Sequence, residues 1–169
     1  MAVMFANALY QRGFVKEGYE VLDSLYRMAQ DADVAKIYPG LPEYFNGEGR
    51  GMYHYLTGSA SWLVLTYLTQ VFGVRGFYGD LLLAPKLIKE DFDQTHEVSV
   101  ESHFAEKKIK IVYRNPKRIP YEHYCITKIM LNGKELKDIE LNKKEVLIKK
   151  EILLKRCRKT DNSLVLTLE

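Results

Sequence analysis

The sequence predicts an α+β fold in two parts, helical over residues 1–79 and β-rich over residues 80–169. Apolar residues recur with helical spacing in the first part and alternate with polar residues after Asp80. Composition changes as well: nine of the twelve tyrosines precede residue 86, and the net charge is −2 over residues 1–85 and +5 over residues 86–169. With 169 residues, the chain is long enough for one large or two small domains.

Two helices are expected before residue 36. "MAVMFANALYQRG" is rich in good helix formers and stops at Gly13, and "FVKEGYEVLDSLYRMAQDA" places Val15, Leu22 and Leu25 on one stripe. A third helix is expected from Gly58 to Gly73. It is apolar nearly all round, which indicates a helix that needs neighbours on most sides, and two other helices cannot enclose it.

Short strands are expected to form a β-sandwich after Asp80. "EVSVESHF", "KKIKIVYRN" and "SLVLTLE" alternate, and Asn132-Gly133 between apolar stretches indicates a hairpin. "KKEVLIKKEILLKRCRK" is read as two strands rather than a basic amphipathic helix, because the apolar triplets 146–148 and 152–154 do not share one helical face.

Composition limits the function classes. The net charge of +3 is too small to indicate a nucleic-acid-binding protein, and no apolar run is long enough for a membrane span. Cys125 and Cys157 belong to no metal-binding motif, and no signal peptide is visible, so we expect reduced thiols, no bound metal and a cytoplasmic protein. The sequence contains no nucleotide-binding or nucleophile-elbow motif.

The loop 38–58 holds the candidate site. Thr57, Gly58 and Ser59 stand where a helix begins, and its free N–H groups suit a phosphate. Taken alone, the same residues equally describe an ordinary helix cap, which is the commoner role. Glu43 beside Tyr44 and Phe45 suits sugar hydroxyls, and Arg50 suits a phosphate or carboxylate. Structural roles are open for Glu43, Arg50 and His54 too.

The stretch from Tyr38 to Leu87, "YPGLPEYFNGEGRGMYHYLTGSASWLVLTYLTQVFGVRGFYGDLLLAPKL", closely resembles the last part of glycoside hydrolase family 94, the inverting β-glucoside phosphorylases. The sequence of this stretch is most similar to those of 1,2-β-oligoglucan phosphorylases and of the corresponding part of cyclic β-1,2-glucan synthases. Cellobiose and chitobiose phosphorylases share the Leu-Thr-Gly core more loosely. The resemblance implies the last helices of an (α/α)₆ barrel followed by an antiparallel C-terminal β-sandwich.

The resemblance also implies a function. In the family, phosphate attacks the anomeric carbon while a carboxylic acid protonates the leaving oxygen. Thr57 and Gly58 match the residues that contact phosphate, so Thr57, Gly58 and Ser59 are the expected phosphate site. Glu43, Asn46 and Arg50 are the expected sugar-binding residues. Inorganic phosphate would be the co-substrate, with no other cofactor, and a β-glucoside or glucooligosaccharide the substrate.

The family's general acid and phosphate-binding histidine match no residue here, and neither Glu43 nor His54 replaces them. We therefore expect the C-terminal piece of a phosphorylase, inactive alone, that needs an upstream barrel chain or self-association, without nucleic-acid or membrane partners. The alternatives are a non-catalytic carbohydrate-binding module and an assembly protein that keeps only the fold.

Overall fold

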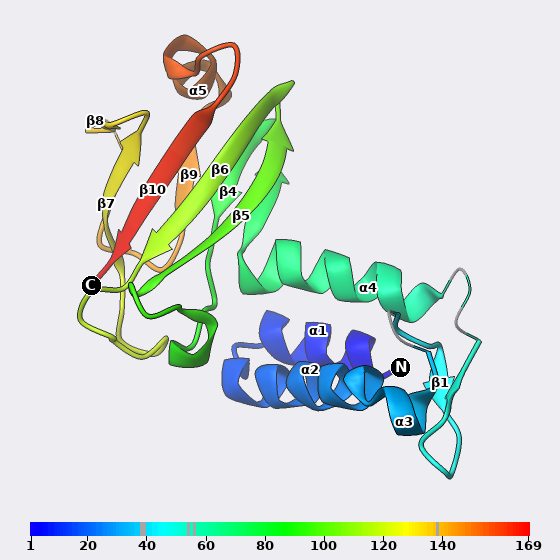
Figure 1. Cartoon of the computed structure of the whole chain (residues 1–169). Coiled ribbons are helices and arrows are strands. Elements are labelled where there is room, and N and C mark those ends of the chain that lie inside the picture. Colours follow the sequence, from blue (N-terminus) through cyan, green and yellow to red (C-terminus); the bar gives the residue numbers. More distant parts are fainter. Residues whose placement is uncertain (38–39, 54, 56, 138) are drawn as a thin grey trace. The chain divides into compact units, whose positions relative to one another are not determined.

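The computed structural model describes residues 1–37, 40–53, 55, 57–137 and 139–169, and these form five α-helices and three β-sheets (Figure 1). The predicted α+β class is thereby confirmed. The chain divides into two compact units, residues 1–70 and 71–169. The division comes earlier than the expected boundary after residue 79, because the hairpin that contains residue 79 pairs with a strand of the second unit.

The first unit is built on three helices, with α1 (Ala2–Gln11) lying between α2 (Val15–Gln30) and α4 (Gly58–Thr66) (Figure 1). Gly18 lets α1 and α2 approach closely, since a Cβ there would lie 2.6 Å from the ring of Tyr10. The buried side chain of Asn7 donates a hydrogen bond of 2.9 Å to Thr66 Oγ1 and so joins α1 to α4. Short elements complete the unit: α3 (Ala32–Ala35), β1 (Tyr44–Phe45), β2 (Gly51–Met52) and the π-helical turn η1 (Tyr67–Val71), which crosses into the second unit.

The predicted apolar helix forms over α4 and η1, and Gly73 follows it with a φ of +65°. Only part of its surface is covered. Val64 and Leu65 are 68% and 45% exposed, whereas Thr66 is fully buried. Apolar side chains of α4 therefore remain exposed among the residues that the structure describes.

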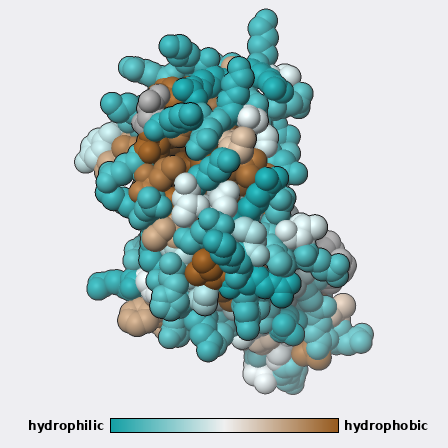
Figure 2. Space-filling view, turned by 90° about the vertical axis from the view of Figure 1, so that its left-hand side faces the viewer, coloured by the Kyte–Doolittle hydropathy of each residue, from teal (hydrophilic) through white to brown (hydrophobic). Residues whose placement is uncertain are grey.

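The second unit contains two sheets. The larger has the order β5-β6-β10-β7-β8 and the smaller the order β3-β4-β9. The bounds are β3 (Val74–Phe77), β4 (Asp80–Leu83), β5 (Glu97–Phe104), β6 (Lys107–Arg114), β7 (Ile126–Leu131), β8 (Lys134–Glu135), β9 (Val146–Ile148) and β10 (Asn162–Leu168), with the 3₁₀ turn η2 (Lys89–Asp91) before β5. Seen from one side, the strand-rich unit carries apolar surface edged by polar residues (Figure 2).

The predicted alternation is confirmed in the central strands. Ile109, Ile111 and Tyr113 of β6 are buried, and Lys108 and Lys110 between them are exposed. The hairpin of β7 and β8 turns at Asn132 and Gly133, both with positive φ, as the Asn-Gly pair predicts.

Two details of the strand prediction are wrong. β10 pairs with β7 in antiparallel orientation but with β6 in parallel orientation, so the larger sheet is mixed. The segment expected to form two strands forms β9 followed by a helix, α5 (Lys150–Arg156). Asp80 Oδ1 accepts a hydrogen bond of 2.8 Å from Lys150 N at the start of α5. Leu153 is the one buried residue of α5, so this helix forms without an apolar stripe along one face. β3 was not anticipated.

No helix in the described part of the chain is both long enough and apolar enough to span a membrane.

Candidate functional site

Thr57 is the N-cap of α4. Its backbone is extended, with φ −78° and ψ 136°, and its Oγ1 accepts a hydrogen bond of 3.0 Å from Ala60 N. The same hydroxyl donates to the carbonyl oxygen of Leu41 at 3.0 Å, which ties the helix to the preceding loop. This is the geometry of an ordinary threonine N-cap.

The carboxylate of Glu43 lies over the first turn of the same helix. Its Oε2 accepts a hydrogen bond of 3.1 Å from Ser59 N, and Ser59 Oγ donates to the carbonyl oxygen of Glu43 at 3.2 Å. A Cβ added at Gly58 would be 3.6 and 3.7 Å from the two carboxylate oxygens. An anionic group thus already occupies the position where the positive end of the helix dipole attracts negative charge.

Glu43 is placed there by the short β1–β2 hairpin that follows it. Glu43 N donates to the carbonyl oxygens of Met52 at 3.1 Å and Tyr53 at 3.0 Å. Asn46 Oδ1 holds the hairpin turn by accepting hydrogen bonds from Glu48 N at 3.0 Å and Arg50 N at 2.9 Å. In the structure, the amide oxygen of Asn46 therefore shapes the loop.

Exposed aromatic rings lie on this hairpin. The rings of Tyr44 and Tyr53 have centroids 6.3 Å apart at an interplanar angle of 35°, and the residues are 50% and 76% exposed. Tyr55 is 82% exposed. Each exposed tyrosine ring presents an apolar face together with a hydroxyl group that can form hydrogen bonds.

The structure brings together four of the six predicted site residues, Glu43, Thr57, Gly58 and Ser59. Asn46 lies in the adjoining hairpin turn. Arg50 directly precedes β2, is exposed, and forms no ion pair among the described residues. Tyr38 and His54 lie outside the described residues. The pairing of Tyr53 with Tyr44 was not singled out from the sequence, and the only local signal for it is the density of tyrosines near the loop.

The described residues of this site include no set of metal ligands. Within the described ranges, no three His, Cys, Asp or Glu side chains come close enough together to hold a metal ion.

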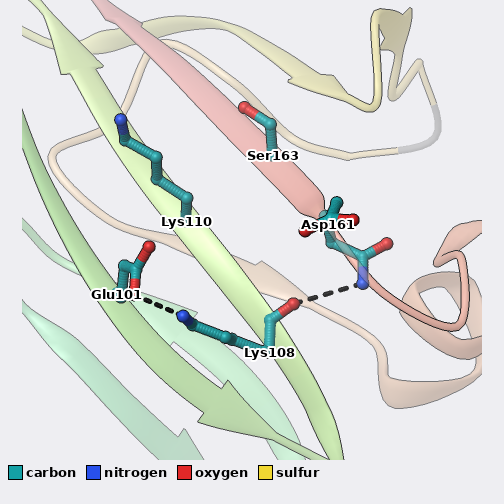
Figure 3. A pocket seen from close by; sticks show the side chains of 6 residues that line it. Glu101, Lys108, Lys110, Asp161 and Ser163 are labelled. Atoms are coloured by element: carbon teal, nitrogen blue, oxygen red, sulfur yellow. Dashed lines mark hydrogen bonds and ion pairs between the residues drawn. The ribbon is translucent and has the colours of Figure 1, made fainter.

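A polar cavity of about 210 Å³ lies in the strand-rich unit (Figure 3). Lys108 Nζ forms an ion pair of 2.6 Å with Glu101, and Asn162 Nδ2 donates to the carbonyl oxygen of Lys108 at 3.2 Å. Lys110, Asp161 and Ser163 complete the lining. Its two lysines are balanced by two carboxylates, so this cavity has no charge preference that would select a phosphate.

Neither of two comparisons with known proteins identifies a relative. No protein-family model matches the chain. A search of curated proteins finds no match either.

Proposed function

We propose that this chain supplies part of the phosphate site and of the sugar site of an inverting β-glucoside phosphorylase. One observation carries the proposal: a helix N-terminus that attracts an anion lies beside the Glu43 carboxylate, and the hairpin that follows Glu43 carries a pair of exposed tyrosine rings. The resemblance of residues 38–87 to glycoside hydrolase family 94 supports the same assignment. In this proposal the helical unit corresponds to the last helices of an (α/α)₆ barrel, and the strand-rich unit corresponds to a C-terminal β-sandwich.

The proposed phosphate ligands are the N–H groups of Gly58 and Ser59 with the Thr57 hydroxyl. The Glu43 carboxylate stands in the way, because it accepts the Ser59 N–H bond itself. Phosphate would have to displace this carboxylate, and the freed Glu43 would then be available to the hydroxyls of a sugar stacked on Tyr44 and Tyr53. Arg50 and Asn46 are the remaining proposed contacts to the sugar.

A second candidate function is a carbohydrate-binding module without phosphate chemistry. The observation that favours it is that Glu43 and Thr57 already accept the N–H groups of Ser59 and Ala60 in the first turn of α4. In that case, the exposed rings of Tyr44, Tyr53 and Tyr55 would bind sugar, and Glu43 would remain on the helix.

Titration of Glu43→Gln with phosphate separates the two candidates. The amide keeps the size of the side chain and an oxygen acceptor, but it removes the negative charge that repels phosphate. If phosphate binds at α4, the backbone amide NMR signals of residues 57–60 should shift at a lower phosphate concentration in Glu43→Gln than in the parent. Sodium chloride at matched ionic strength is the control for screening.

Thr57→Ala is the companion variant. Loss of the cap should reduce the free energy of unfolding by about 0.5–2 kcal/mol in either case. If phosphate shifts no amide in the parent or in Glu43→Gln, the phosphate role fails, and binding of a glucooligosaccharide alone would then favour the second candidate.

A further inference from the structure

An apolar groove of about 590 Å³ lies between α1 and α2. Phe5 and Leu9 form part of its wall from α1, and Leu25 and Met28 form part of it from α2. Phe5 is 58% exposed and Met28 is 45% exposed. Apolar side chains of this size gain roughly 25 cal/mol for each Å² that a partner removes from water. An exposed apolar strip of this kind is typical of an interaction surface.

The spacing of the lining residues indicates what shape fits. Phe5 and Leu9 are four residues apart on α1, and Leu25 and Met28 are three residues apart on α2, so each helix presents a ridge along the groove. A third helix packs well between two such ridges, with its own apolar residues at i, i+3, i+4 and i+7.

The charges of the groove indicate the partner's chemistry. Among the described residues, its charged lining consists of Glu17 and Glu20, both exposed, and no lysine or arginine lines it. Asp23 and Arg27, which are also on α2, form an ion pair of 2.7 Å with each other and are not part of the lining. The groove therefore combines an apolar floor with an acidic edge.

A second copy of the same groove is a poor occupant. Two grooves packed face to face would bring four carboxylates into one interface, and like charges in contact oppose association. We propose instead that the groove binds an amphipathic helix of another protein, with apolar residues along one face and lysine or arginine residues flanking them. The lining residues that the structure describes all fall between Ala2 and Met28, so failure of this proposal can be distinguished from failure of the phosphate and sugar proposal.

A designed peptide tests the groove with the full chain. The probe is a fluorescein-labelled helix of about four turns, with leucines at i, i+3, i+4 and i+7 and lysines beside them, and the control peptide has glutamates in place of the lysines. Fluorescence anisotropy should show saturable binding of the lysine peptide and much weaker binding of the glutamate peptide.

Two variants locate the binding. Glu17→Lys combined with Glu20→Lys should weaken the lysine peptide by about tenfold and strengthen the glutamate peptide, since the charges across the interface are exchanged. Phe5→Ala should weaken both peptides, and its exposed position leaves the fold intact. The matched control is Glu106→Lys combined with Glu122→Lys, which makes the same charge change at exposed positions of the other unit and should leave binding unchanged.

Three results would overturn the proposal. One is the absence of saturable binding, and another is equal weakening by the two double variants, which would indicate a general charge effect. The third is a concentration-dependent dimer in sedimentation equilibrium that Phe5→Ala abolishes, because the occupant would then be a second copy.

Discussion

The carboxyl group of Asp91 illustrates how burial acts on one residue. Burial raises its pKa to about 6, although Ile88 N donates a hydrogen bond of 2.8 Å to Oδ2 and opposes this shift. The folded state therefore holds a proton that the unfolded state releases, and the free energy of unfolding falls as pH rises from about 4 to about 6. Asp91→Asn keeps an oxygen for Ile88 and removes the buried charge. It should be more stable than the parent at pH 7, by no more than about 3 kcal/mol, and the difference should vanish near pH 4.

Urea unfolding at pH 7 and at pH 4 measures the stability of Asp91→Asn relative to the parent. Asp93 provides the matched control. The hydroxyl of Thr95 and the backbone N–H of Glu97 lower its pKa. Its contribution to stability is therefore present above the unfolded pKa and is lost as pH falls, so Asp93→Asn should show the opposite sign. An Asp91→Asn variant that is less stable than the parent at pH 7 would refute the role assigned to burial.

At the scale of elements, two hairpins of the larger sheet use the same turn with different residues. Ala105 and Glu106 connect β5 to β6 with φ of +47° and +63°, whereas Asn132 and Gly133 connect β7 to β8. A left-handed backbone costs about 1–2 kcal/mol at an ordinary residue, and glycine avoids most of this. Glu106→Gly should therefore raise the free energy of unfolding by up to about 1 kcal/mol after the entropy of glycine is counted.

Gly133→Ala provides the reverse experiment. No atom in the described part of the chain lies within 4 Å of the added Cβ, so a loss of stability is attributed to the backbone conformation. Chemical denaturation of both variants measures the effect, and a Glu106→Gly variant less stable than the parent would show that strain in this turn is negligible.

At the scale of the whole molecule, we expect no phosphorolysis by this chain alone. No residue matches the general acid of the phosphorylases that residues 38–87 resemble, and such a group contributes about 10²–10⁴ in rate. Incubation of the pure protein with β-1,2-glucooligosaccharides and phosphate should release no glucose 1-phosphate above a protein-free blank. Steady release that is proportional to protein concentration would contradict the prediction and would require an acid within this chain.

Much of the fold follows from neighbours in the sequence. The helices α1 and α2, the alternation in β5, β6 and β10 and the Asn132-Gly133 turn were predicted because helical and strand periods depend on local backbone geometry. The helix α5 was missed because its segment buries only Leu153 and so has no apolar stripe.

The candidate site also has features that the sequence predicted and features that it could not predict. The sequence alone indicated a helix start at Thr57-Gly58-Ser59 and a preceding loop crowded with aromatic and acidic side chains. The structure identified Thr57 as the cap, with Ala60 three residues away as its partner. Only the tertiary structure decided that Glu43 reaches the N–H of Ser59, sixteen residues along the chain, and that β10 lies parallel to β6. Contacts between distant residues are selected by burial and hydrogen bonding over the whole chain, and no local pattern records which partner satisfies them.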